Sequence, residues 1–355
     1  MLLPRSLEPF FIKQIMDYLA LRVHTYKTKT VIMKKKLPVL LPLLLLIFLL
    51  LFPQTSLKGA KNGLLLWFNQ VLPALWPCMI LSQLCLNSGI WKKADGSGDS
   101  EIGRLSHLSG CGWYIALLGL LCGIPMGAKM VHDFLVRRKI TEHEARFLLI
   151  FCNQLSPAFL IEFVFADLFP EPGMRRIMVL SYYMSVFLLW FVGRWIFPFK
   201  GQMPLLSAQG CASSELDCTE KKEASQTFCL SENLDTSIMN SLETILRIGG
   251  YILLFSVLAA IVQGIAPFSQ TVRSILVSVF EITTGLGQLQ ACRLNAVVKS
   301  ILFNSLCAFG GLSSLMQVCG MLRETGLPVR VCIMAKLGQG ALTALITGLL
   351  FFFVL

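Results

Sequence analysis

Charged residues are scarce in this sequence. Asp, Glu, Lys and Arg make up 14% of its 355 residues, whereas a soluble domain carries roughly 25%. Hydrophobic residues make up 55%, and the mean hydropathy is +0.69. Because too few polar side chains are present to cover a surface in water, the composition excludes a soluble globular protein.

The sequence also lacks stretches of alternating polarity, and it contains only 6 Tyr and 6 Trp. A transmembrane β-barrel would need the alternation and bands of aromatic residues, so this class is a poor alternative. The apolar residues instead form blocks close to the roughly 20 residues with which a helix crosses a bilayer. We therefore predict an all-α polytopic membrane protein.

Motifs for catalysis and metal binding are absent as well. The sequence has no Walker A loop, no HExxH, no GxSxG and no dinucleotide-binding glycine pattern. None of its 12 cysteines forms a CxxC pair, and the three in a polar loop (Cys211, Cys218 and Cys229) match no metal template. We expect no enzymatic activity, no cofactor and no metal site.

A net charge of +11 would suit a nucleic-acid partner, but the placement of the charge does not. The basic residues stand in short runs beside the apolar blocks, as at 34–36 and 137–139. Such runs set the orientation of a membrane protein, and no basic, aromatic-bearing module accompanies them. We expect the lipid bilayer as partner, no nucleic acid, and a cytoplasmic amino terminus.

Four parts are expected along the chain. A leader without a membrane-length apolar run precedes Met33, which we hypothesise to be the true start. An uncleaved anchor helix (Leu37–Phe52) opens the first membrane half, and a polar connector leads to the second half. The expected parts are 1–32, 33–198, 199–236 and 237–355. After the anchor we predict eight further apolar segments, for about seven to nine spans: 64–86, 110–127, 147–168, 175–196, 245–265, 271–287, 294–312 and 331–355.

The two membrane halves share a pattern of interrupted helices. Each contains a glycine-rich break, and Gly123 and Gly310 stand 187 positions apart, close to the 181 between Trp67 and Ile248. Paired breaks in two related halves indicate a transporter site, because free backbone groups in a membrane need a cavity or ligand. The alternative is that Gly and Pro only allow close helix packing.

Polar residues accompany these breaks and are candidates for solute binding, since ionisable groups are costly inside a membrane. Lys129 could instead reach the interface and serve topology. Glu281 is harder to explain in that way because Phe280 and Ile282 flank it. The predicted substrate-binding residues are Gly123, Pro125, Gly127, Lys129, Asn153, Ser156, Pro157, Glu281, Thr283, Gly310, Gly311, Ser313 and Gln317.

These motifs resemble the sporulation integral membrane protein family of the YlbJ type, whose members carry the gate, or nucleoside-recognition, domain. Gly123–Lys129 (GIPMGAK) and Phe151–Pro157 (FCNQLSP) carry the resemblance in the first half, and Glu281–Thr283 and Phe309–Ser313 in the second. The resemblance spans about residues 33–350. It implies a spore-forming bacterium, a mother-cell-derived membrane around the forespore, and movement of dipicolinic acid towards the forespore.

A binding mode follows from that resemblance. Dipicolinate is a planar dianion, and the free amides at half-helix amino termini suit carboxylates. The breaks at Gly123–Gly127 and Gly310–Ser313 would bring two such termini together in the membrane. Lys129 would then supply positive charge, and Glu281 would carry a coupling proton or cation. The hydrogen-bond donors would be Asn153, Ser156 and Gln317.

Two other functions stay open. A transporter of a nucleoside-like solute would need Asn153 and Gln317 but not Lys129. A membrane scaffold in cortex or coat maturation would transport nothing and would depend on the 199–236 loop. A second copy of the chain or other sporulation membrane proteins stay open as partners.

Overall fold

The computed structural model describes residues 42–43, 45–88, 108–161, 171–197, 230–265, 267–323 and 325–354. Every regular element in these ranges is a helix, which confirms the predicted all-α fold. The leader (1–32) and residues 199–229 of the connector lie outside the described residues. The chain divides into two units, Met1–Ser56 and Leu57–Leu355, and in the first unit residues 45–51 are helical and α2 (Pro53–Leu66) begins.

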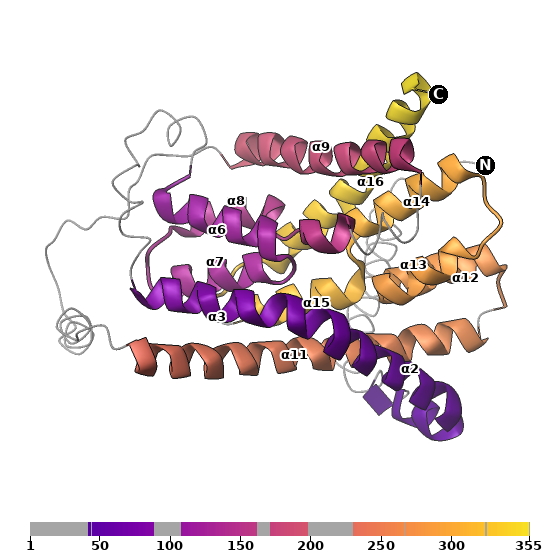
Figure 1. Cartoon of the computed structure of the whole chain (residues 1–355), viewed down its shortest axis with the longest axis horizontal. Helices are drawn as coiled ribbons and strands as arrows, with labels where there is room; N and C mark the ends of the chain where they lie inside the picture. The colour runs from indigo at the N-terminus through magenta and orange to yellow at the C-terminus, as the bar shows by residue number, and fades with distance from the viewer. Residues whose placement is uncertain are drawn as a thin grey trace, which may run out of the picture. The chain divides into compact units, whose positions relative to one another are not determined.

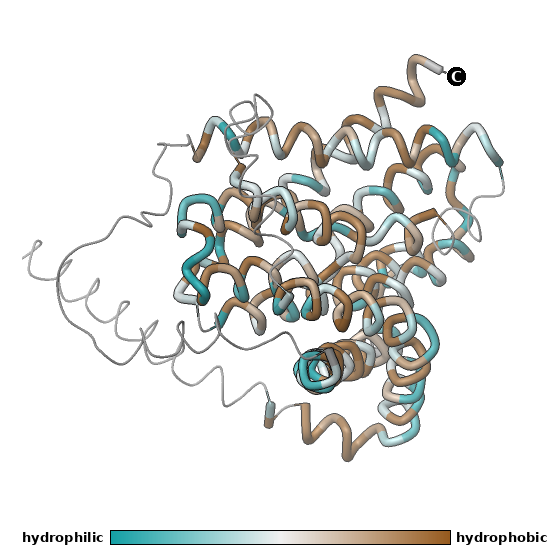
Figure 2. Tube along the Cα trace, turned by 60° about the vertical axis from the view of Figure 1, so that its left-hand side comes forward, coloured by the Kyte–Doolittle hydropathy of each residue, from teal (hydrophilic) through white to brown (hydrophobic). Residues whose placement is uncertain are grey.

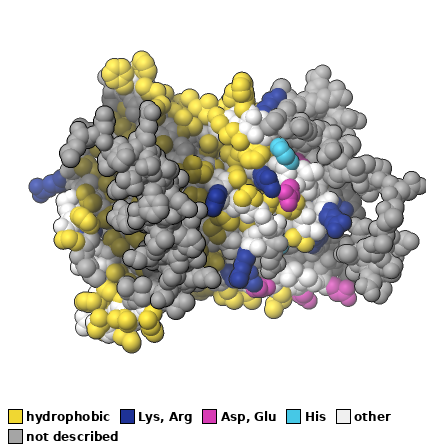
Figure 3. Space-filling model, turned by 180° about the vertical axis from the view of Figure 1, so that it is seen from behind, with side chains coloured by type: hydrophobic (Ala, Val, Ile, Leu, Met, Phe, Trp, Pro, Cys, Tyr) yellow, Lys and Arg dark blue, Asp and Glu magenta, His cyan; other side chains and the backbone are white. Residues whose placement is uncertain are grey.

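Several of the described helices are long and apolar enough to cross a membrane, and their outer faces are apolar. Side chains such as Phe187, Trp195 and Phe352 are exposed, and apolar residues line much of each long helix (Figure 2). On the face in Figure 3, hydrophobic side chains form broad areas of the described surface. Such a surface is unfavourable in water but matches lipid, so the chain is an integral, multi-pass membrane protein. The five candidate spans are Pro53–Ser88, Pro172–Ile196, Ser231–Gly264, Ala296–Leu322 and Val329–Phe353.

The first helices of the second unit pack on a helix from the other half. After α2, a π-helical turn, η1 (Trp67–Val71), leads into α3 (Leu72–Ser88). Trp67 Nε1 donates a 3.0 Å hydrogen bond to the carbonyl oxygen of Ile245 in α11 (Leu230–Ile265). α11 begins inside the predicted connector, so the last seven connector residues, 230–236, are helical.

The remaining helices follow one order twice (Figure 1). Each time, two short helices form a hairpin, a third ends at an interruption, and a helix of 25 or 26 residues closes the series. The first series is α6 (Gly110–Cys122), α7 (Met126–Val136), α8 (Glu142–Phe151) and α9 (Pro172–Ile196). The second is α12 (Gln270–Phe280), α13 (Ile282–Gln290), α14 (Ala296–Phe309) and α16 (Val329–Val354), with α15 (Gly311–Leu322) after the interruption.

The spacing of this repeat is about 157 residues. α9 begins at Pro172 and α16 at Val329, 157 positions later; α8 ends at Phe151 and α14 at Phe309, 158 positions later. The predicted pairing of Gly123 with Gly310 at 187 positions is therefore wrong. The break after α6 corresponds instead to the one between α12 and α13, which contains no glycine, so a comparison of glycine-rich segments could not find it.

In both hairpins the two helices pack so closely that one position in each hairpin requires glycine. A Cβ on Gly119 in α6 would overlap the backbone of Cys152 and lie 3.0 Å from the Cα of Gly127 in α7. A Cβ on Gly285 in α13 would overlap the backbone of Ser278 in α12. Each short helix thus folds back on its neighbour, as α12 and α13 do in Figure 1.

Candidate functional site

Four helix interruptions meet in the second unit. A Cβ on Gly123 would lie 3.1 Å from the backbone nitrogen of Ser156, and one on Gly310 would lie 3.4 Å from the Cδ1 of Ile124. A Cβ on Gly311 would lie 3.5 Å from the backbone nitrogen of Ile282. The interruptions that these contacts join are Gly123–Pro125, residues 153–156, Glu281 and Gly310–Gly311. The interruptions at Gly123 and Gly310 were expected to meet. The interruptions at residues 153–156 and at Glu281 lie against them as well.

The first interruption, Gly123–Pro125, is stabilised by the side chain of Asn153, which belongs to the second interruption. α6 ends at Gly123, whose φ of 93° favours glycine, and α7 starts after a cis Ile124–Pro125 bond. The backbone N–H of Ala128 donates a 2.7 Å hydrogen bond to Asn153 Oδ1. Asn153 is 3% exposed, and its Nδ2 has no partner among the described residues. Asn153 therefore satisfies one amide of α7 and keeps a buried donor unused.

The segment after α8 combines a buried amide with a helix cap. Gln154 is fully buried, and its Oε1 accepts hydrogen bonds from Tyr182 Oη at 3.1 Å and from Gln339 Nε2 at 2.7 Å. Ser156 is half-buried, and its Oγ accepts a 3.3 Å hydrogen bond from the backbone N–H of Phe159, at the start of a short helix that opens with Pro157. The predicted donor Ser156 thus acts as an N-cap.

Glu281 caps a helix within its own hairpin. Its carboxylate accepts hydrogen bonds from the backbone N–H groups of Thr283 at 3.2 Å and Thr284 at 2.7 Å, and from Thr283 Oγ1 at 2.7 Å. It is 3% exposed and sits at the positive end of the α13 dipole. Helix capping is therefore sufficient to explain why the carboxylate of Glu281 is buried between two apolar residues.

The last interruption leaves a helix start without a side-chain cap. Gly310 (φ 81°) ends α14 and Gly311 begins α15, and no side chain caps its first amides. Gln317 Nε2 donates to Ser313 Oγ at 3.3 Å, and both residues are buried. Of the two helix starts expected to present free amides, α15 lacks a cap, whereas α7 receives one from Asn153.

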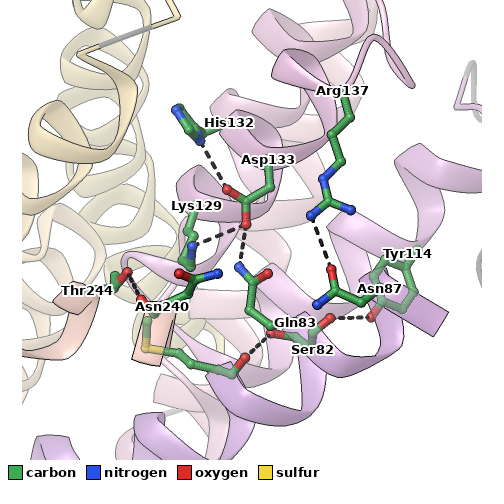
Figure 4. A network of polar contacts seen from close by, with 11 residues as sticks. Ser82, Gln83, Asn87, Tyr114, Lys129, His132, Asp133, Arg137, Asn240 and Thr244 are labelled. Carbon is green, nitrogen blue, oxygen red and sulfur yellow. Dashed lines mark hydrogen bonds and ion pairs between the residues drawn. The ribbon is translucent and has the colours of Figure 1, made fainter. Parts of the chain in front are cut away.

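Lys129 lies in a compensated charge network rather than alone (Figure 4). Its Nζ is 3.2 Å from Asp133 Oδ2, which also accepts a 2.6 Å hydrogen bond from Gln83 Nε2 of α3. The Nδ1 of His132 lies 3.1 Å from Asp133 Oδ1. Together with Leu75, Met79, Pro125 and Met126, Lys129 lines a small hollow. Its positive charge is thus already matched by a carboxylate.

A second buried lysine, which the sequence analysis missed, lies beside the breaks. Lys336 of α16 is 5% exposed, and its Nζ is 3.2 Å from Gln154 Oε1, 3.1 Å from Gln339 Oε1 and 3.4 Å from the carbonyl oxygen of Ala308. All three contacts are neutral oxygens, and no carboxylate pairs with Lys336 among the described residues. A lone charge inside the apolar segment 331–355 is the signal that could have identified it.

The fold and these breaks define a class: a polytopic α-helical membrane protein with interrupted helices in its core. Compared with known proteins, the chain is 25% identical over 319 residues to the sporulation integral membrane protein YlbJ of Bacillus subtilis (strain 168). The match covers 84% of this chain and 78% of that protein. This similarity confirms the resemblance that the motifs show to the YlbJ-type family of sporulation integral membrane proteins, and it supports a membrane role in sporulation. No family model and no solved structure matches the chain.

Proposed function

We propose that this protein transports a small anionic solute across a membrane during spore formation, with dipicolinate as the candidate solute moved towards the forespore. The observation that carries the proposal is the meeting of four helix interruptions in one region. Interrupted backbone inside a membrane protein persists where its polar groups face a cavity or a ligand. Repeated hairpins with breaks that meet are the arrangement expected of a transporter that binds its solute between two halves.

The polar groups around the breaks favour an anion. Lys336 brings a positive charge that no carboxylate of the described residues offsets, and Asn153 Nδ2 is a buried donor without a partner among them. Among the described residues, the one carboxylate at the four breaks belongs to Glu281, and it accepts hydrogen bonds from the first amides of α13. The amino group of Lys336 and the unused donor of Asn153 suit a solute rich in acceptor oxygens.

The test is uptake of labelled dipicolinate into vesicles that carry the purified protein, with a nucleoside assayed in parallel. We expect saturable uptake of labelled dipicolinate, and unlabelled dipicolinate should inhibit it by competition. A matched control is Arg247→Gln, which removes an exposed i,i+4 ion pair with Glu243 of α11 and should leave uptake unchanged. Uptake of neither solute by folded protein contradicts transport and favours a scaffold. Nucleoside uptake alone contradicts the anionic solute.

A nucleoside-like solute is the second candidate, and the side-chain amides at the breaks support it. Gln154, Gln339 and Asn153 are buried, and neutral amides of this kind recognise bases and sugars by hydrogen bonds. Lys336 disfavours a nucleoside-like solute, because a neutral solute leaves the charge of Lys336 uncompensated.

A further inference from the structure

A buried lysine contacts one glutamine at the meeting point of the breaks, and the residue before that glutamine carries a buried, unused donor. Lys336 Nζ contacts Gln154 Oε1 at 3.2 Å, and Asn153, whose Nδ2 has no partner among the described residues, precedes Gln154 in the chain. Lys336 also contacts the carbonyl oxygen of Ala308, two residues before the break at Gly310. Asn153 thus belongs to an interrupted segment, and Lys336 of the continuous helix α16 contacts residues at or beside two of them.

The charge at this point is unbalanced in the described part of the chain. A lysine buried in an apolar helix is costly unless another charge offsets it. Lys129 has its offset in Asp133, at 3.2 Å, whereas Lys336 contacts only amide and carbonyl oxygens. The missing negative charge is therefore one that a ligand can bring.

We propose that Lys336 binds a carboxylate of the transported anion and that Asn153 Nδ2 donates a second hydrogen bond to it, which rests on the proposed transport function. A carboxylate entering here takes the place of one neutral oxygen around Lys336 Nζ. The exchange is favourable because a hydrogen bond between two charged groups is roughly twice as strong as one between neutral groups. The residue that selects for charge is then Lys336 of α16 rather than Lys129 of α7.

The experiment compares a charged solute with a neutral one of the same shape. Vesicles carrying wild-type protein or Lys336→Met are supplied with labelled pyridine-2,6-dicarboxylate or with its diamide, and KM is measured for each. We expect Lys336→Met to raise the KM of the dicarboxylate at least about tenfold, because it removes a charged hydrogen bond. The affinity for the diamide should change less than about twofold, since a neutral ligand gains little from the ammonium charge.

Two further variants keep the test independent of folding. Lys299→Met removes a lysine of α14 whose Nζ donates to the carbonyl oxygen of Gln290, and it should leave both KM values unchanged. Asn153→Asp keeps an oxygen that accepts from the Ala128 amide but replaces the unused donor by negative charge, so it should weaken only dicarboxylate uptake.

The outcomes separate the two proposals. Wild-type protein that is folded but takes up neither probe overturns the transport function itself. Wild-type uptake of the dicarboxylate, with both KM values unchanged in Lys336→Met, overturns the role of Lys336 and leaves transport standing. An equal rise in both KM values overturns it as well, because it indicates a change in site shape rather than a lost charge.

Discussion

The two halves of the second unit stabilise similar helix breaks by different means. In the first half, the hairpin of α6 and α7 is capped from outside, since Asn153 of the next segment accepts from the Ala128 amide. In the second half, the hairpin of α12 and α13 caps itself, since Glu281 accepts from Thr283 and Thr284. The capping of the first hairpin therefore depends on a contact with another segment, and the capping of the second does not.

The buried lysines of the two halves also differ in how they are stabilised. Lys129 in the first half is paired with Asp133, and Lys336 in the second half contacts only neutral oxygens. A paired lysine contributes to holding the fold, whereas an unpaired one gains most when an anion arrives. On our proposal, Lys129 carries a structural charge and Lys336 a functional one, and the following changes test this distinction.

The largest effect is expected from breaking the charge pair of the first half. Asp133→Asn leaves the ammonium of Lys129 buried without a carboxylate, and we expect the free energy of unfolding to fall by about 3 kcal/mol. Denaturant titration in detergent micelles measures it. Adding Lys129→Met to Asp133→Asn should recover most of the loss, since no unpaired charge then remains. A double variant as unstable as the single one contradicts the pairing.

The next effect concerns the closed hairpin of the second half. Gly285→Ala places a methyl group on the backbone of Ser278, and overpacking of this kind costs about 2 kcal/mol. Gly287→Ala, in the same helix, meets nothing within 4 Å and should stabilise α13 slightly because alanine favours helix. Thermal unfolding of both variants in the same detergent is the measurement. Equal midpoints would show that α12 and α13 do not pack as described.

A smaller effect tests the self-capping of that hairpin. Glu281→Ala removes the acceptor for the Thr283 and Thr284 amides, and loss of an N-cap costs about 1 kcal/mol. Glu281→Asp shortens the side chain but keeps a good capping residue, so it should lose less. Denaturant titration ranks the two. If Glu281→Ala leaves stability unchanged while transport stops, the carboxylate acts on a coupling ion as first predicted, not as a cap.

Much of the fold was predictable from local signals, because helices and their breaks depend on neighbouring residues. Apolar blocks predicted the long helices, and the glycines and prolines at Gly123–Gly127 and Gly310–Gly311 predicted two interruptions that the structure contains. The break at Glu281 carries no glycine, so it looked like a charge inside a span rather than the end of one helix and the start of another.

The partners of the buried lysines were less predictable, because they depend on contacts between distant segments. Asp133 follows Lys129 by one helical turn, so this pair could have been read from the i,i+4 spacing. Lys336 and Gln154 are 182 positions apart, and no local pattern brings them together. The charge of Lys336 was visible in the sequence, but its lack of a carboxylate partner among the described residues required the packed helices.

The smallest effect on stability is expected at Lys336, and it gives the sharpest comparison. Lys336→Met removes a buried charge without leaving another unpaired, and Gln154 Oε1 keeps its hydrogen bonds from Tyr182 and Gln339. The free energy of unfolding should change by less than about 1 kcal/mol. Lys129→Met, measured by the same titration, should cost about 3 kcal/mol because it leaves Asp133 buried without its cation. If the two substitutions cost the same, Lys336 holds the fold as Lys129 does, and its charge is not kept for a ligand.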